Sequence, residues 1–285
     1  MARATIAAKA AAPTTISRTP TTTIVATNTP GLPAVSGNLF FAHAGAGMEH
    51  VGVSDLLVPR LALLQAMSPQ LVRSRSEYID GAQPGDIVDT GTGDIFDGGV
   101  LFLPVHYRKD FIEWLGTKPG GGLVRVHSDP AILDTCRRNE SGQAITASGN
   151  TIAETAQFFG LNLTAQHRRC FVPMTSTQLK KARRWMTLAT GERLKRDNGS
   201  EFTAPLFYRT YLLTSAEETN AHGSWAGWKV ERGKSLPEYA AEAGLNVNAI
   251  IDDVTKFRAS IVKGEAKADT ASMAEPAGNS SDIPF

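Results

Sequence analysis

Both ends of the chain have compositions that build no packed core, and this confines a compact fold to the segment between them. Residues 1–48 contain no Asp or Glu and only three basic residues, and Thr, Ala and Pro dominate their first part. Residues 264–285 are again rich in Ala, Gly and Ser. Such segments bury too little apolar surface to offset their ordering entropy. The sequence therefore predicts a disordered basic arm at 1–48, one folded domain at 49–263, and a disordered acidic tail at 264–285.

The charge of the chain is unevenly distributed, although its formal net value is only +1. From Gln166 to Arg196 there are nine Lys or Arg residues against a single acid, Glu192. After Gly264 the balance reverses, with four acids and the terminal carboxylate against Lys267. A basic body with an acidic tail points to an anionic partner such as nucleic acid.

The compartment follows from cysteine usage and hydropathy. Two cysteines, Cys136 and Cys170, are too few for a disulfide framework and fit a reducing cytoplasm. No apolar run reaches 18 residues, so we expect no membrane span. The acid-poor start also fits an organellar transit peptide, but its prolines and threonine clusters disfavour the helix such a signal forms. We therefore expect a cytoplasmic protein with a disordered arm.

The body reads as strands followed by helices. Strand-like patterns occupy 57–65, 86–90, 100–115, 123–126 and 168–174, whereas 139–163 has no clear pattern. Two further strands, 206–214 and 224–230, flank a turn and are expected to pair. Helices are expected at about 176–190, at 235–243 after a capping box, and at 248–263. The stripe of the first helix is Leu179, Ala182, Met186 and Ala189. This order predicts a mainly β, α+β fold with C-terminal helices.

Basic and aromatic residues are interleaved on the last two predicted strands. Alternation places Phe207, Arg209 and Tyr211 on one face of the first strand, and Trp225 and Lys229 on one face of the second. If these faces match, they form a platform of rings edged by cations, which suits single-stranded nucleic acid. The alternative is that the rings are core and the charges an ordinary solvated face. We expect stacking by Phe207, Tyr211 and Trp225, and phosphate neutralisation by Arg168, Arg169, Lys180, Lys181, Arg183, Arg184, Arg209 and Lys229.

Signatures of catalysis or metal binding are weak. No phosphate-binding loop and no His-Glu-x-x-His helix occurs. Asp86, Asp89, Asp94 and Asp97 could hold a metal but lie among glycines, where turn roles are favoured. His127, Cys136, His167 and Cys170 have zinc-ligand chemistry, with only one closely spaced pair among them. We therefore predict no catalytic residue, no cofactor and no metal, with buried cysteines and solvated histidines as the preferred interpretation.

The chain ends in Asp282-Ile283-Pro284-Phe285, a free carboxyl terminus carrying a ring, a rigid proline and an acid. Capture of such a terminus is a recurring recognition mode. The ending resembles the C-terminal tip of bacterial single-stranded DNA-binding proteins, which recruits replication and repair enzymes. It departs from that family upstream, where Asn279-Ser280-Ser281 replaces a run of aspartates. The resemblance implies that Asp282, Ile283, Pro284 and Phe285 bind a partner protein.

A looser resemblance covers the body. The segments Val58 to Gln65, Ser176 to Leu179 and Trp225-Ala226-Gly227-Trp228 are similar to phage-encoded proteins regarded as single-stranded DNA-binding. This resemblance implies an OB-like small β-barrel with long insertions, whose open face accepts a strand of nucleic acid.

Together these features predict a non-catalytic protein that coats and protects single-stranded DNA during phage replication, recombination or repair. Its expected partners are single-stranded DNA and, through the tip, replication or recombination proteins of the host cytoplasm. A homo-oligomer is compatible with this function. Two alternatives stay open: a strand-annealing recombinase, and a metal-dependent nuclease that would use the aspartate cluster.

Overall fold

The computed structural model describes residues 43, 46–52, 55–116, 122–140, 142–220, 223–270 and 273. Contacts divide the chain into residues 1–42 and residues 43–285, and all described residues belong to the second unit. The predicted arm at 1–48 lies largely outside the described residues, and so do the four residues of the C-terminal tip.

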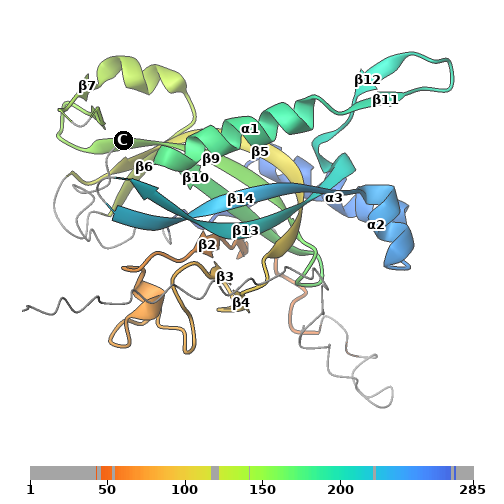
Figure 1. The fold of residues 1–285 in the computed structure, drawn as a ribbon, viewed down its shortest axis with the longest axis horizontal. Helices are drawn as coiled ribbons and strands as arrows, with labels where there is room; N and C mark the ends of the chain where they lie inside the picture. The colour runs from red at the N-terminus through yellow and green to blue at the C-terminus, as the bar shows by residue number, and fades with distance from the viewer. Residues whose placement is uncertain are drawn as a thin grey trace, which may run out of the picture. The chain divides into compact units, whose positions relative to one another are not determined.

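An antiparallel sheet of eight strands forms the centre of the fold and curls into a half-barrel (Figure 1). Its order is β14-β13-β5-β9-β8-β7, with β10 beside β9 and β6 beside β5. The strands are β5 (Val100–Trp114), β6 (Leu123–His127), β7 (Arg137–Arg138), β8 (Ala144–Ile145), β9 (Thr151–Asn162), β10 (Arg168–Thr175), β13 (Arg209–Asn220) and β14 (Gly223–Ser235). The prediction of a mainly β fold is confirmed.

Shorter elements complete the body. A three-stranded sheet contains β2 (Leu61–Leu63), β3 (Ile87–Asp89) and β4 (Ile95–Phe96), and two-stranded sheets join β1 (Leu57–Val58) to β15 (Lys267–Ala268) and β11 (Arg193–Lys195) to β12 (Glu201–Thr203). The α-helices are α1 (Leu179–Thr190), α2 (Leu236–Glu242) and α3 (Val247–Val262). Single 3₁₀ turns are η3 (Pro69–Leu71), η5 (Ser176–Gln178) and η6 (Leu206–Tyr208), and η4 spans Pro130–Thr135.

The adjacent strands β5 and β9 are shaped by a proline and a glycine that face each other. Pro104 pairs with Gly160, and the register shifts directly afterwards, between Pro104 and His106. Proline donates no ladder hydrogen bond, so inside a sheet it belongs at such an irregularity. A Cβ on Gly160 would lie 2.3 Å from the carbonyl oxygen of Leu103 and 2.5 Å from the ring of Phe102. Only glycine therefore leaves room for the buried Phe102 ring.

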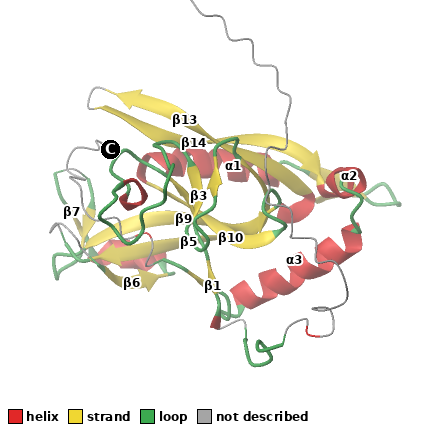
Figure 2. Cartoon of the chain, turned by 90° about the horizontal axis from the view of Figure 1, so that it is seen from below, coloured by secondary structure: helices red, strands yellow, loops and turns green. Residues whose placement is uncertain are grey.

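Helices cover the sheet on two sides (Figure 2). α3 buries Val254, Phe257 and Ile261 in a cluster with Phe159 and Phe171 of the sheet. α1 buries Trp185 in a second cluster, where its ring stacks on Phe158 at 3.9 Å between centroids, and Phe102 and Tyr211 meet it edge-on. The hydrophobic stripe predicted for this helix omitted Trp185, which is its most buried large side chain.

The structure corrects three element assignments. The unpatterned stretch 139–163 contains β9, whose burial on both faces removes the alternation that marks a strand. Residues 206–208 form η6, so the expected strand begins only at Arg209. The folded body also continues past Gly264: β15 pairs in parallel with β1, and Ala266 is 4% exposed in the α3 cluster. The predicted tail is therefore partly ordered, because these residues fill the space beside β1.

We predict that Trp185→Ala lowers the free energy of unfolding by about 3–5 kcal/mol, since it removes a large ring from a packed cluster. Urea unfolding followed by circular dichroism measures the change. The matched control is Leu188→Ala on the same helix, where the side chain is 38% exposed. Equal losses for the two variants would contradict the assigned role of Trp185.

Candidate nucleic-acid interface

The exposed side of α1 carries three cations that the fold leaves free. Ala182, Trp185 and Ala189 face the core, so Lys180, Arg183 and Arg184 point outward and are exposed. Within the described part of the chain, none of these three side chains forms an ion pair. Free cations on a rigid helix can neutralise phosphates without first breaking an internal contact.

A β-hairpin arm made by β11 and β12 continues this surface and projects beyond the end of α1 (Figure 1). Leu194 pairs with Phe202 in its register, and the guanidinium of Arg196 lies 5.1 Å from the centre of the Phe202 ring. The arm also carries two acids, Asp197 and Glu201, both exposed. We call the exposed cations of α1 and the arm the basic ridge: Lys180, Arg183, Arg184, Arg193, Lys195 and Arg196.

The arm is the part of this surface that sequence reasoning did not assign. Arg193, Lys195 and Arg196 contributed to the excess of positive charge, but neither they nor Phe202 appeared as contact residues. The signal was the turn Asp197-Asn198-Gly199 between two short polar strands, which is typical of a hairpin.

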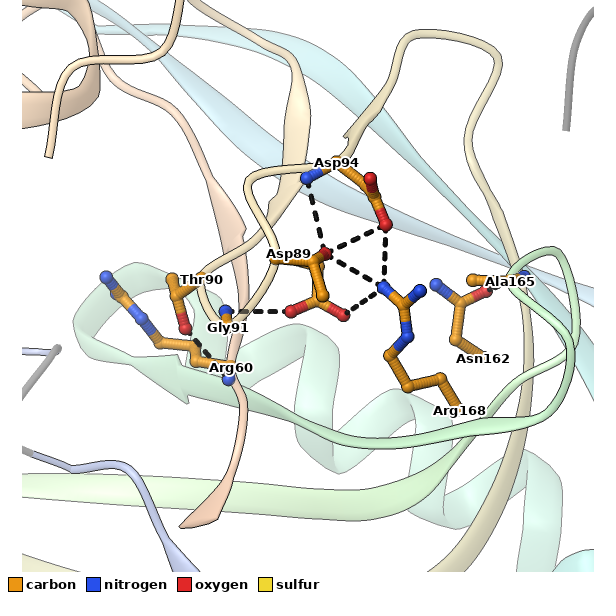
Figure 3. Close-up of polar contacts among 9 residues, drawn as sticks. Arg60, Asp89, Thr90, Gly91, Asp94, Asn162, Ala165 and Arg168 are labelled. Atoms are coloured by element: carbon orange, nitrogen blue, oxygen red, sulfur yellow. Dashed lines mark hydrogen bonds and ion pairs between the residues drawn. The ribbon is translucent and has the colours of Figure 1, made fainter. Parts of the chain in front are cut away.

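Arg168 and Arg169 do not belong to the ridge, because each is held by acids of the body. The Arg168 guanidinium donates to Asp94 at 2.6 Å and lies 3.4 Å from the fully buried Asp89, as Figure 3 shows. This contact holds the pKa of Asp94 below its ordinary value. Arg169 pairs with Asp253 of α3 at 2.7 Å. Both arginines therefore join separate elements of the fold, and the continuous phosphate track expected from Arg168 to Arg184 does not form.

Three other predicted cations are also paired. Arg209 donates two hydrogen bonds to Glu192, at 3.1 and 2.6 Å. Lys229 lies 3.1 Å from Glu231, with both side chains about half exposed. Lys181 contacts Glu218, and burial lowers the pKa of this lysine. Of these three pairs, that of Lys229 with Glu231 is the most exposed, and such a pair contributes little to stability and opens easily.

The predicted platform of rings is only partly present. Tyr211 is 1% exposed in the α1 cluster, so its assignment as an exposed stacking residue is wrong. Phe207 is half-buried and packs against the α3 cluster. Trp225 is half-buried and donates its indole N–H to Glu218 at 3.0 Å.

The pairing register explains this outcome. Trp225 and Lys229 lie opposite Glu218 and Thr214, on one face of the β13–β14 ribbon. Trp228 lies opposite Ser215, on the face that also carries Tyr211. The face match assumed for Tyr211 and Trp225 is therefore wrong. Tyr211 packs under α1 against Trp185, whereas Trp225 is only half-buried and is linked to α1 through the contact between Glu218 and Lys181.

The residues with metal-ligand chemistry are dispersed. Among the described residues, no group of three or more His, Cys, Asp and Glu side chains could hold a metal ion. Cys170 is fully buried, and His167 lies 3.0 Å from the hydroxyl of Tyr239. His127 lies 2.9 Å from Glu113, and the Cys136 thiol contacts the carbonyl of Ile132.

The aspartates instead serve local structure. Asp86 and Asp97 accept backbone hydrogen bonds from Gln83 and Gly98 in turns, and Asp89 accepts one from Gly91. These contacts agree with turn roles for the aspartates.

None of the helices in the described ranges is long and apolar enough to cross a membrane.

Comparison with known proteins identifies a family that covers most of the chain. A family model described as Pam3 phage gp34-like protein matches residues 36–262. No curated protein and no solved structure matches the chain significantly.

We predict that Arg168→Met lowers the free energy of unfolding by about 1 kcal/mol at pH 7, since the buried Asp89 and the partly exposed Asp94 both lose a charged donor. Because the folded-state pKa of Asp94 is depressed, its share is present above the ordinary Asp pKa near 3.9 and vanishes as pH falls through the lower folded value.

Urea unfolding of wild type and variant at pH 7 and near pH 3 measures the loss and its pH dependence. Arg183→Met is the control and should leave stability unchanged at both pH values, because this side chain is exposed on α1. A deficit of Arg168→Met that grows towards pH 3 would contradict the role given to Asp94.

Proposed function

The chain belongs to the family of Pam3 phage gp34-like proteins. We propose that this phage protein binds single-stranded DNA through the basic ridge. In this proposal it coats and protects transient single strands during replication, recombination or repair in the cytoplasm of the infected host. It acts by binding alone, without a catalytic residue or a cofactor.

One observation carries the proposal: the basic ridge holds exposed cations beside a tryptophan, while most other candidate cations are paired. Lys180, Arg183 and Arg184 are exposed on α1 and form no ion pair among the residues that the structure describes, and the neighbouring Lys181 is linked through Glu218 to Trp225. Cations that track phosphates beside a ring that accepts a base are the elements of single-strand binding. The ridge therefore replaces the broader track expected from sequence, and Phe202 of the arm is a second candidate ring.

The curled sheet supports the choice of a single strand over a duplex. α1 lies with one side on the sheet, so its cations border a sheet surface and do not stand out as a helix that enters a groove. In the finer, OB-like interpretation, a strand of DNA lies along the open face of a curled sheet. Lys229, half exposed on the Trp225 face, extends the cation border there once its pair with Glu231 opens.

The C-terminal tip completes the proposal. Asp282, Ile283, Pro284 and Phe285 lie outside the described residues, and their role rests on the resemblance of this ending to the tips of bacterial single-stranded DNA-binding proteins. We propose that they recruit replication or recombination proteins, while the ridge holds the DNA.

DNA binding by the ridge can be tested directly. Fluorescence anisotropy should show tighter binding of a single-stranded oligonucleotide than of the matching duplex, with affinity falling steeply between low and moderate salt. The triple variant Lys180→Met, Arg183→Met, Arg184→Met should reduce the salt slope by about 2, since each lost phosphate contact on a single strand contributes about 0.7. Equal affinity for both forms of DNA would contradict the stacking proposal.

The matched control removes the same number of cations from another helix region. Lys256, Arg258 and Lys263 are exposed in α3 and at its end, and α3 lies on another side of the sheet. The triple variant Lys256→Met, Arg258→Met, Lys263→Met should retain the wild-type salt slope. If both triple variants lose the same slope, binding is not localised at the ridge.

A deletion distinguishes the role of the C-terminal tip from that of the ridge. Deletion of Asp282–Phe285 should leave DNA affinity nearly intact and abolish capture of purified host replication and repair proteins, because the two surfaces contact different ligands. Phe285→Ala is the milder variant and should weaken capture in the same way. Equal loss of DNA binding and of capture would show that the tip belongs to the fold.

A further inference from the structure

Glu218 is the acid that stands between the ridge and the candidate stacking ring. Its carboxylate contacts Lys181 of α1, accepts the indole N–H of Trp225 at 3.0 Å, and lies 3.4 Å from the amide nitrogen of Gln178. The Lys181 and Glu218 side chains are 28% and 24% exposed, so this cluster is partly screened but open to solvent. The Glu218 carboxylate therefore binds both the Lys181 ammonium and the Trp225 indole, which are the two groups that a nucleotide at this position would contact.

The backbone around Glu218 is shaped for this contact. A Cβ on Gly227 would lie 2.3 Å from a Glu218 carboxylate oxygen and 2.7 Å from the Lys181 ammonium nitrogen. The carboxylate and the ammonium thus meet directly over Gly227 of β14, in space that a side chain at this position would share. Gln178 also accepts a hydrogen bond from the backbone N–H of Trp228 at 3.0 Å, which fastens the start of α1 to the same strand.

The chemistry of the carboxylate resembles that of a DNA phosphate. Each linking phosphate of DNA carries one negative charge, as Glu218 does, and offers oxygens that accept from an ammonium and from an N–H donor. Burial lowers the pKa of Lys181, so this ammonium benefits from a close anion. Glu218 has a flexible side chain at a part-exposed position, so it can turn towards solvent when another anion takes its place.

We propose that Glu218 is an internal stand-in for phosphate: single-stranded DNA displaces it from Lys181 and frees the Trp225 ring to stack on a base. This inference rests on the proposed function and identifies the subsite where the first base and phosphate bind. An isolated anion gains only the polar contacts that the carboxylate gives up, with Lys181 and the Trp225 N–H, whereas a nucleotide also gains stacking on the Trp225 ring. Glu218 thereby selects ligands that present a phosphate and an unpaired base together.

The neighbouring Glu217 provides a matched control. It carries the same charge on the same strand, but it lies opposite Ala226 on the other face and is exposed. Glu217→Gln and Glu218→Gln therefore change the net charge equally, but only Glu218→Gln alters the cluster with Lys181, Trp225 and Gln178.

The test measures oligonucleotide affinity by anisotropy for wild type, Glu218→Gln, Glu217→Gln, and each of these with Lys181→Met. Glu218→Gln should tighten single-strand binding by about threefold to tenfold and steepen the salt slope by about 0.7, because Lys181 becomes free for one phosphate. Glu217→Gln should have a smaller effect. In the Lys181→Met background the gain from Glu218→Gln should disappear, as a double-mutant cycle requires for coupled residues.

Three outcomes are decisive. Equal effects of the two glutamate variants, or a gain that persists without Lys181, would overturn the role of Glu218 while wild-type binding leaves the proposed function standing. Failure of the wild type and of every variant to bind single-stranded DNA would refute the proposed function and this inference with it. Urea unfolding of the Lys181→Met protein checks that its loss of coupling does not come from loss of the fold.

Discussion

The stacking of Trp185 on Phe158 fixes α1 on the sheet, and the position of the basic ridge depends on it. The three exposed cations of α1 do not pack on the sheet, so only the apolar side of the helix stabilises its position there. Trp185 is the largest buried side chain on that side, and Phe102 and Tyr211 enclose its ring edge-on. This arrangement is also why Tyr211 is part of the core and offers no face to a ligand.

The body divides its cations between two tasks. Arg168, Arg169 and Arg209 each tie separate elements together through carboxylates, and Asp89 is fully buried beneath one of them. A buried carboxylate without its cation is costly, so Arg168 above Asp89 and Arg209 beside the largely buried Glu192 are committed to the fold, whereas the pair of Arg169 and Asp253 is more exposed. Within the described residues the cations of the basic ridge form no ion pair except Lys195, which lies 4.0 Å from the exposed Glu201, so they are available to an anionic ligand. Lys181 lies at the border between the two groups, because its partner Glu218 is only partly buried.

Much of the fold could be predicted from local patterns. β5, β6 and β10 lie where apolar runs placed them, and the capping box at Ser235 and Glu238 opens α2. Prediction failed where the environment changes the pattern: β9 is buried along most of its length and shows no alternation, and β15 is two residues long and ordered only by its pairing with β1. A strand that forms only by pairing with a distant segment has no signal in its own local sequence.

The sequence by itself determined that a folded body lies between two low-complexity ends. It also determined which residues could take part in binding, namely the excess cations from 166 to 196 and the aromatic residues of the last hairpin. Only the tertiary structure decided which of them are available. Strand alternation gives two faces but not which face meets which, and a shift of one residue in the register of β13 and β14 exchanges them. The choice of Trp225 over Tyr211 as the accessible ring follows from that register, which contacts between distant parts of the chain set.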